Sequence, residues 1–298
     1  MKKILSMLFI LIATLVLVGC GSSKVTEEVK VITPQGNPFI AVGNLIGEEN
    51  ITIDSVNGAA GVQAALIANE YDVVIAPLNL GAKLYVNGKS KYQLNAVIAL
   101  GNTYIISKTA TTLSSVQDLN GKTIIAYSQG GTPDIILQQV LKANNVTAEI
   151  EYVAGASDVL PLFMQGKYDY ALAAEPVITN LKVNKKLELN VLNLQDYIDT
   201  TIMQAAIFVN SESTKQDSIK ALIKKIEKNI KDMNNYPEEY ANSIVSKDTY
   251  FSGLGVEIIS KSLPNTNLDF LDAKDNKDKI EGYLTMIGQT LPNEDFYQ

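Results

Sequence analysis

The chain has 298 residues and a formal net charge of −7, and its composition excludes several kinds of chemistry. It contains no histidine and a single cysteine, Cys20, so it lacks the commonest general base, the usual zinc ligand and a disulfide framework. All 25 cationic residues are lysine, which removes the arginine clamp for phosphates and carboxylates. The acidic balance argues against nucleic acid as a partner.

Residues 1–19 have the pattern of a targeting segment. Lys2 and Lys3 precede an apolar run, residues 4–18, which is shorter than the roughly 20 residues of a membrane-spanning helix. The run ends in LVGC, which resembles the lipobox of bacterial lipoproteins, where the signal is cleaved before an acylated cysteine. The alternative is an ordinary secretory signal with an incidental cysteine. We expect a signal peptide over 1–19, a palmitate-type lipid anchor on Cys20 and a polar tether over 20–28.

Predicted strands and helices alternate after the tether. Residues 29–33, 51–56 and 71–76 predict strands, and each leads through a turn-rich loop into a helical pattern. The same order returns after predicted strands at 122–127 and 148–153. This alternation predicts mostly parallel sheets flanked by helices.

One phrase occurs twice, as EYDVVIAPLN at 70–79 and as KYDYALAAEP at 167–176. Val56 and Gly58 match Val153 and Gly155 at the same offset, so we expect two lobes of similar α/β architecture. The Tyr-Asp pairs, Tyr71-Asp72 and Tyr168-Asp169, begin the strands and are expected to be structural.

Two further strands, at 104–108 and 203–210, are expected to cross between the lobes. The expected boundaries are therefore 29–107 plus 205–298 for the first lobe and 108–204 for the second. In the tail, a lysine-rich helix has one apolar face, which predicts packing beneath a solvated surface; a membrane-surface helix is the alternative. That face consists of Ile219, Leu222, Ile223, Ile226, Ile230 and Met233.

Acidic residues recur every three positions near the C-terminus, at Asp269, Asp272, Asp275 and Asp278. A calcium loop needs alternate acidic positions and a central glycine, so a solvated helix face is expected and no metal site.

The lipobox-like segment, the two crossovers and the phrases DLNGKTIIAYSQGG and GKYDYALAAEP resemble the substrate-binding lipoproteins of ABC importers. The resemblance covers roughly residues 29–290 and is to the nitrate/sulfonate/taurine and thiamine-precursor-binding group of type II solute-binding proteins. It implies a two-lobed periplasmic-binding-protein fold, no cofactor, and delivery of a small solute to a permease whose ATPase is a separate subunit. We expect a monomer on the outer face of the cell membrane. The absence of a GxxxxGK[ST] loop agrees with a separate ATPase.

Ligands of open α/β sheets bind beyond the carboxyl ends of the strands, and the loops there supply the predicted site. The expected contacts from the first lobe are Gln35, Gly36, Asn37, Asn57, Gly58, Ala59, Pro77 and Asn79. Those from the second are Ser128, Gln129, Gly130, Gly131, Thr132, Gly155, Ser157 and Glu175.

Two features of the second-lobe loops suggest how a solute is held. The glycine turn at 130–132 can offer N–H donors to an anion or a carbonyl, or can serve only as a helix cap. The resemblance places Glu175 at a strand end, where a carboxylate facing the cleft would bind an amine or ring N–H; a solvent-exposed loop carboxylate is the alternative.

The expected solute is small and polar: a sulfonate, a nitrate-like anion or a pyrimidine-like precursor. The aromatic candidates for stacking on a ring are Phe39, Tyr104, Tyr127 and Phe163. A sensor or adhesin that keeps the fold without feeding a transporter is the alternative function. An enzyme is not expected, because the related pyrimidine synthase uses cysteine and histidine chemistry that this chain cannot supply.

Overall fold

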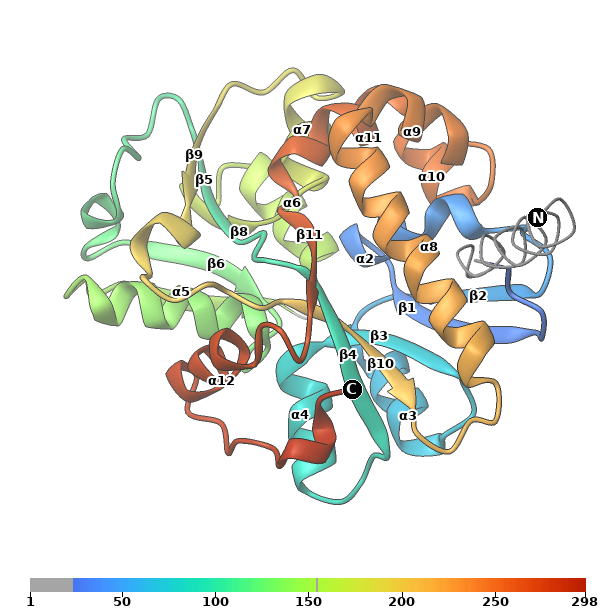
Figure 1. The fold of residues 1–298 in the computed structure, drawn as a ribbon. Coiled ribbons are helices and arrows are strands. Elements are labelled where there is room, and N and C mark those ends of the chain that lie inside the picture. The colour runs from blue at the N-terminus through green and yellow to red at the C-terminus, as the bar shows by residue number, and fades with distance from the viewer. Residues whose placement is uncertain (1–23, 154) are drawn as a thin grey trace, which may run out of the picture.

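The computed structural model describes residues 24–153 and 155–298 as two β-sheets flanked by helices (Figure 1). The first sheet has the strand order β11-β4-β10-β3-β1-β2, and the second has β7-β6-β8-β5-β9. The predicted signal peptide and Cys20 lie outside the described residues.

The first sheet comprises β1 (Val29–Pro34), β2 (Ile51–Val56), β3 (Val73–Pro77), β4 (Tyr92–Ala99), β10 (Ala205–Asn210) and β11 (Leu268–Asp272). The second comprises β5 (Tyr104–Lys108), β6 (Thr123–Tyr127), β7 (Glu149–Val153), β8 (Tyr170–Ala173) and β9 (Leu189–Asn193). The helices that follow the strands of the two repeated units are α2 (Asn37–Val42), α3 (Ala59–Ala68), α4 (Leu78–Val86), α5 (Thr132–Ala143), α6 (Ala156–Met164) and α7 (Val177–Val183). The tail adds α8 (Gln216–Asn235), α9 (Pro237–Ile244), α10 (Thr249–Leu254), α11 (Val256–Ser262) and α12 (Lys277–Met286).

The repeated sequence order becomes a repeated strand order. In the first sheet β1 pairs in parallel with β2 and β3, and in the second β6 pairs in parallel with β7 and β8. Each central strand is thus the first of its unit, and a helix follows each of the six strands of the two units. The predicted two-lobed α/β fold is confirmed, because two strand–helix units of equal order form separate sheets.

Both sheets are mixed, where mostly parallel ones were expected. β4 runs in the direction of β3, and the chain then enters the second sheet as β5, antiparallel to β8 and β9. β9 returns in the direction of β8, and β10 enters the first sheet antiparallel to β3 and β4. Each crossover strand therefore starts at the edge where its neighbours end. The carboxyl ends of the parallel strands in the two sheets consequently face each other.

The predicted lobe boundary also differs from the pairing. β5 lies entirely within the second sheet, although residues up to 107 were assigned to the first lobe. The link between β4 and β5 is short, so the second sheet begins earlier than the sequence pattern indicated.

Helices cover both faces of the first sheet. Ile207 and Val209 of β10 pack in one apolar cluster with α2, α8 and α9, while Phe208 between them packs in another with α3, α4 and α12. This alternation follows from the two-residue repeat of a β-strand. The second cluster continues into the second lobe through Ile202 and Met203, which are buried in the link before β10.

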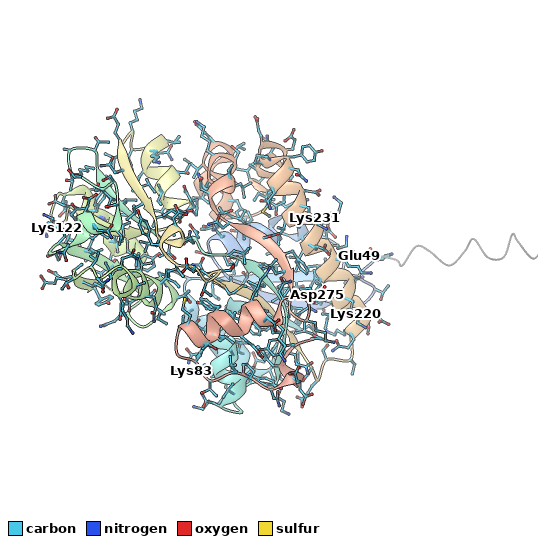
Figure 2. The ribbon with its side chains drawn as sticks, turned by 60° about the vertical axis from the view of Figure 1, so that its left-hand side comes forward. Glu49, Lys83, Lys122, Lys220, Lys231 and Asp275 are labelled. Carbon is cyan, nitrogen blue, oxygen red and sulfur yellow. The ribbon has the colours of Figure 1, made fainter. Side chains whose placement is uncertain are left out.

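The tail helix α8 has the predicted amphipathic form. All six residues of its expected apolar face are buried, and Lys220 and Lys231 lie exposed on its outer surface (Figure 2). The predicted tether is shorter than expected, because Val25 is buried and the N–H groups of Thr26 and Glu27 donate to Ser218 Oγ at the start of α8. No helix in the described part of the chain has the length and hydropathy needed to span a bilayer.

The C-terminal aspartates do not share a helix face. Asp269 and Asp272 lie in β11, and Asp275 precedes α12, so the helix prediction is wrong for this segment. Their three-residue spacing crosses a strand end and a turn. Over residues 24–153 and 155–298 no cluster of acidic or cysteine side chains is suited to a metal ion.

Candidate solute-binding site

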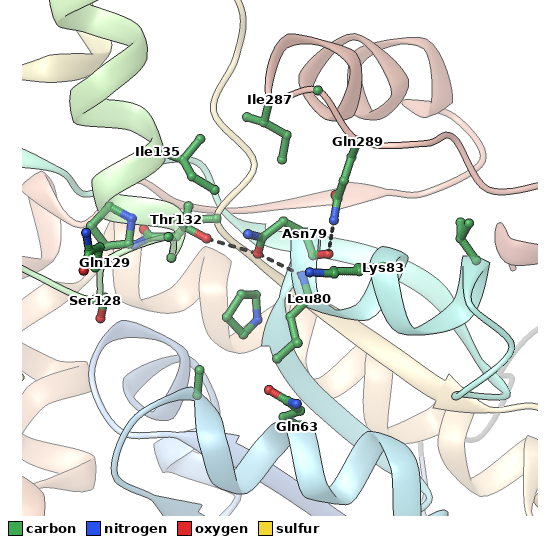
Figure 3. A pocket seen from close by; sticks show the side chains of 18 of the residues that line it. Gln63, Asn79, Leu80, Lys83, Ser128, Gln129, Thr132, Ile135, Ile287 and Gln289 are labelled. Carbon is green, nitrogen blue, oxygen red and sulfur yellow. Dashed lines mark hydrogen bonds between the residues drawn. The ribbon is translucent and has the colours of Figure 1, made fainter. Parts of the chain in front are cut away.

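A pocket of about 790 Å³ lies between the two lobes, at the facing strand ends (Figure 3). One wall comes from α3 and α4 of the first lobe, and the opposite wall comes from the loop between β6 and α5. The residues that follow α12 form a third wall. The described residues that line it are Ala59, Gln63, Pro77, Asn79, Leu80, Lys83, Val86, Asn87, Tyr127, Ser128, Gln129, Gly130, Gly131, Thr132, Pro133, Ile135, Gln204, Ile287, Gly288, Gln289 and Thr290.

Asn79 connects all three walls. Its Oδ1 accepts hydrogen bonds from the Leu80 N–H at 2.9 Å and from Thr132 Oγ1, across the cleft, at 3.2 Å. Its backbone carbonyl accepts a hydrogen bond from Gln289 Nε2 at 2.6 Å. The two lobes therefore touch inside the pocket through a first-lobe amide and a second-lobe hydroxyl.

The second-lobe loop uses several of its own donors. The Gly131 N–H donates to the Ser128 carbonyl at 2.7 Å, and the Gly130 N–H donates to Asp134 Oδ2 at 2.7 Å. Ser128 and Gly130 have positive φ angles of 55° and 72°, which form the turn that brings Asp134 beneath it. The expected cradle of free N–H groups is therefore partly closed by the protein itself.

The lining is rich in amides and carries little charge. Among the described lining residues, Lys83 is the only charged one. It lies one helical turn after Asn79 on α4, so both side chains occupy the same face of the helix (Figure 3). Leu80, Ile135 and Ile287 add an apolar part, so a solute would meet amide donors and acceptors beside aliphatic surface.

Comparison with known proteins assigns the chain to a family. Residues 47–240, more than half of the sequence, match the family model described as NMT1/THI5 like. The chain belongs to the NMT1/THI5-like family. A comparison with curated protein sequences gives no match.

Solved structures share the fold of this NMT1/THI5-like chain. An ABC transporter protein from Parabacteroides distasonis has a TM-score of 0.75 at 22% identity, over 91% of this chain and 98% of that one. The periplasmic aliphatic sulphonate-binding protein SsuA from Escherichia coli has a TM-score of 0.66 at 12% identity, over 87% of each chain. The alkanesulfonate-binding protein SsuA from Xanthomonas axonopodis pv. citri, bound to MOPS, has a TM-score of 0.64 at 14% identity, over 92% of this chain and 97% of that one.

These likenesses establish the periplasmic-binding-protein fold, and with the family match they confirm the resemblance drawn from the sequence. At such identities they show the fold alone. The solute of the NMT1/THI5-like chain has to be argued from its own pocket.

The pocket gathers about half of the predicted contacts. Those that line it are Ala59, Pro77, Asn79, Ser128, Gln129, Gly130, Gly131 and Thr132. Gln35, Gly36, Asn37, Asn57, Gly58, Gly155 and Glu175 are not among its described lining residues. The side chain of Ser157 is outside the described part of the chain.

Glu175 does not face the pocket as expected. Its side chain is buried, and Oε2 accepts a hydrogen bond from the Thr179 N–H at 3.0 Å in the first turn of α7. Its backbone N–H donates to Asn102 Oδ1 at 2.7 Å, and Asn102 Nδ2 donates to its carbonyl at 2.9 Å. Burial raises the pKa of this carboxyl, while the hydrogen bonds from Thr179 oppose that rise. Glu175 thus joins the start of α7 to the hinge between β4 and β5.

Other predicted residues also turn inward. Asn37 is buried, and its Nδ2 donates to the Thr266 carbonyl at 3.2 Å, so this side chain ties α2 to the tail. Of the four aromatic candidates, Phe39, Tyr104 and Phe163 are buried in the core, and Tyr127 lines the pocket. Burial raises the pKa of Tyr127 to about 12, so its hydroxyl stays protonated at neutral pH.

Sequence reasoning missed Gln204 and the third wall. Gln204 precedes β10, and residues 287–290 follow α12, far along the chain from the repeated phrases. No turn motif or repeat marked either segment. The helical spacing of Lys83 and Asn87 after Asn79 could have identified those two residues, because positions i, i+4 and i+8 share a helix face.

Proposed function

We propose that this protein is the extracytoplasmic solute-binding component of an ABC importer. The observation that carries the proposal is the pocket shared by both lobes, in which Thr132 of one lobe contacts Asn79 of the other. A solute held there gains contacts from both sheets only when the lobes are together, so binding favours the closed form. The family match and the neighbouring structures of binding proteins support this assignment.

The solute we propose is small and polar. A pocket of about 790 Å³ lies within the range of roughly 300–1,000 Å³ that is common for small-molecule sites. Amide side chains provide both donors and acceptors, which suits a pyrimidine-like precursor, and Lys83 provides a cation for a sulfonate or a nitrate-like group. Binding rather than catalysis is proposed, because the chain has no histidine and its one cysteine is Cys20.

We further propose that the protein is a lipoprotein held at the outer face of the cell membrane through Cys20. The lipobox-like LVGC and the short apolar run before it support cleavage and acylation there. A monomer that passes its solute to a permease with a separate ATPase subunit completes the proposal.

A solute panel tests the function. The purified protein is heated with sulfonates, amino sulfonates, nitrate and pyrimidines, and its melting temperature and radius of gyration are measured. A bound solute at 100 times its dissociation constant should raise the unfolding free energy by about 2.7 kcal/mol and make the protein more compact. If a solute raised the melting temperature without lowering the radius of gyration, that result would contradict capture between the lobes.

The lipid anchor has its own test. Mass spectrometry of protein extracted from membranes should show a chain that begins at acylated Cys20, and a Cys20→Ser variant should not be processed. An unmodified Cys20 would contradict the lipoprotein assignment and leave solute binding unaffected.

A further inference from the structure

The folded part of the chain begins five residues after the proposed lipid anchor. Val25 is buried, and the N–H groups of Thr26 and Glu27 donate to Ser218 Oγ in the first turn of α8, at 3.2 Å and 3.0 Å. An extended chain spans at most about 3.6 Å per residue, so Cys20 lies within about 18 Å of Val25. A lipid on Cys20 therefore keeps the start of α8 close to the bilayer.

The outer face of α8 carries a row of lysines that begins beside this attachment. The helix has 20 residues and is about 30 Å long, and its apolar face is buried in the first lobe. Four exposed lysines recur every three or four positions on the opposite face, so they share one side of the helix, and Figure 2 shows two of them there. This lysine stripe consists of Lys220, Lys224, Lys228 and Lys231.

The lysine stripe is least neutralised at the start of the helix. Lys228 and Lys231 each form an ion pair with a carboxylate one turn away on α8. Lys220 and Lys224 form no ion pair with any residue in the described part of the chain. The two unpaired ammonium groups are thus the ones nearest to the lipid anchor.

We propose that the lysine stripe docks the first lobe onto an anionic lipid bilayer. The phosphate groups of the lipids bind the exposed ammonium groups once the anchor has brought α8 to the surface. The helix does not insert, because its apolar face is already packed against the first lobe. No residue of the stripe lines the pocket, so docking leaves the pocket free. The inference rests on the proposed lipid anchor and adds the orientation of the anchored protein.

The stripe depends on the anchor for its effect. The chain has a net charge of −7, and exposed carboxylates lie near the stripe, namely Asp217 in the first turn of α8 and Glu49 next to the ion pair of Glu48 with Lys225. Free protein is therefore repelled by an anionic surface as a whole. A short tether gives the stripe a high effective concentration at the bilayer, and the stripe then determines which face is turned toward it.

Lysine footprinting of the acylated protein tests the proposal. The protein is inserted through its lipid into vesicles of phosphatidylcholine, with or without phosphatidylglycerol, and is treated briefly with a water-soluble acetylating reagent. Mass spectrometry then gives the labelling rate of each lysine relative to the same protein in detergent. Lys220 and Lys224 should be protected in the anionic vesicles, and added salt should remove the protection because it screens exposed charges. Lys122 of the second lobe, on the other side of the molecule in Figure 2, should label equally in all samples.

A double variant tests the stripe through the lysines that remain. Lys220→Gln combined with Lys224→Gln should lower the ratio of docked to undocked molecules by about fivefold for each lysine removed, the ratio that 1 kcal/mol produces. Lys228 and Lys231 should then lose their protection in anionic vesicles. All four side chains are exposed, so the variant keeps the fold, and its solute binding should be unchanged.

A matched variant of the second lobe controls for net charge. Lys122→Gln combined with Lys185→Gln removes the same charge from exposed positions outside α8 and should leave the protection of the stripe intact. Lengthening the tether with glycine and serine after Ser23 should weaken the protection, because the effective concentration at the bilayer falls with tether length.

The outcomes separate this proposal from the proposed function. If Cys20 were acylated and the stripe labelled equally in anionic vesicles and in detergent, the anchor would stand and the docking would be wrong. Equal protection in vesicles of phosphatidylcholine alone would also overturn it, because proximity without charge recognition would explain the result. If Cys20 carried no lipid, the anchor and this inference would fail together, while solute binding would stand.

Discussion

The unit β3-β1-β2 of the first lobe and the unit β8-β6-β7 of the second share their strand order but differ in how their helices begin. In the second lobe, Asp134, Asp158 and Glu175 accept hydrogen bonds from the N–H groups of Gly130, Gly155 and Thr179 near the starts of α5, α6 and α7. In the first lobe, the first turns of α2, α3 and α4 contain no acidic residue.

This difference shows that the repeat preserves the scaffold and changes its electrostatics. A carboxylate at a helix start satisfies N–H groups that have no partner within the helix and stabilises its dipole. In the second lobe, carboxylates of the protein itself accept hydrogen bonds from some of these N–H groups. The helix starts of the first lobe carry no such carboxylate, and at α4 the Leu78 N–H donates to the Gln204 carbonyl and the Leu80 N–H to Asn79 Oδ1.

A second comparison concerns the Tyr-Asp pairs at the strand starts. Tyr71 Oη donates to Asp54 of β2 at 2.9 Å, and Tyr168 Oη donates to Glu151 of β7 at 2.5 Å, each to a carboxylate on the preceding strand of the chain, two positions away in the sheet. Asp72 is buried and accepts hydrogen bonds from the Lys30 N–H, Ser213 Oγ and Lys215 Nζ, whereas Asp169 is exposed. The tyrosines are equivalent in the two lobes and the aspartates are not.

The largest expected effect is on the free energy of unfolding, and it distinguishes Asp72 from Asp169. Asp72→Ala should lower the free energy of unfolding by about 2–3 kcal/mol, because it leaves the Lys30 N–H and Ser213 without their acceptor. Asp169→Ala is the matched control and should change it by less than about 0.5 kcal/mol, because this side chain is exposed. Denaturant unfolding at neutral pH measures both. Equal losses would mean that the two aspartates play equivalent roles.

The buried acids of the two lobes should give opposite pH dependence. Burial alone would raise the pKa of Asp72, but the hydrogen bonds from Lys30, Ser213 and Lys215 lower it overall. Its stabilisation is present above the unfolded pKa of about 3.9 and is lost as the pH falls through the folded pKa. Burial raises the pKa of Glu175, so its contribution is full in acid and declines as the pH rises through the folded pKa.

Glu175→Gln isolates the second half of this prediction. The variant keeps an acceptor for the Thr179 N–H without a buried charge, so its stability relative to the natural chain should improve between pH 4 and pH 8. Thermal unfolding across that range measures the difference. A variant that became relatively less stable as the pH rose would show that the ionised carboxylate is favourable at this position.

The smallest effect should be the same in both lobes. Tyr71→Phe and Tyr168→Phe each remove one hydroxyl that bonds an exposed carboxylate, so each should cost no more than about 1 kcal/mol. Chemical denaturation of the two variants checks this equality. A cost of several kcal/mol in one lobe alone would break the equivalence of the tyrosines.

The sequence predicted the scaffold well, because hydrophobic alternation and turn residues report local structure. The strands at 29–34, 51–56 and 149–153 match their predicted positions closely, and the apolar face of α8 is buried as expected. Strands β4, β9 and β11 were not predicted, since their pairing depends on neighbours distant in the sequence. The crossover strands made both sheets mixed for the same reason.

The site was harder to predict because side-chain direction at a strand end is decided by tertiary packing. Asn79 and Glu175 follow matching strands, yet Asn79 lines the pocket and Glu175 turns onto the start of α7. No motif marked Asp134, and its hydrogen bond from the Gly130 N–H depends on the turn formed by Ser128 and Gly130. Gln204 enters the pocket where the chain returns to the first lobe before β10, and Gln289 enters it because α12 packs against that lobe.

The hydrogen bond from Thr132 to Asn79 joins the two lobes through the protein's own side chains. An interlobe hydrogen bond that needs no solute lowers the free energy of the closed conformation relative to the open one. Solute-free molecules therefore spend part of their time closed. Under the proposed function, such closed, solute-free molecules compete with solute-loaded ones for the same permease. Under the proposed function, the permease then has to distinguish solute-loaded from solute-free molecules by the solute itself as well as by the closed shape of the two lobes.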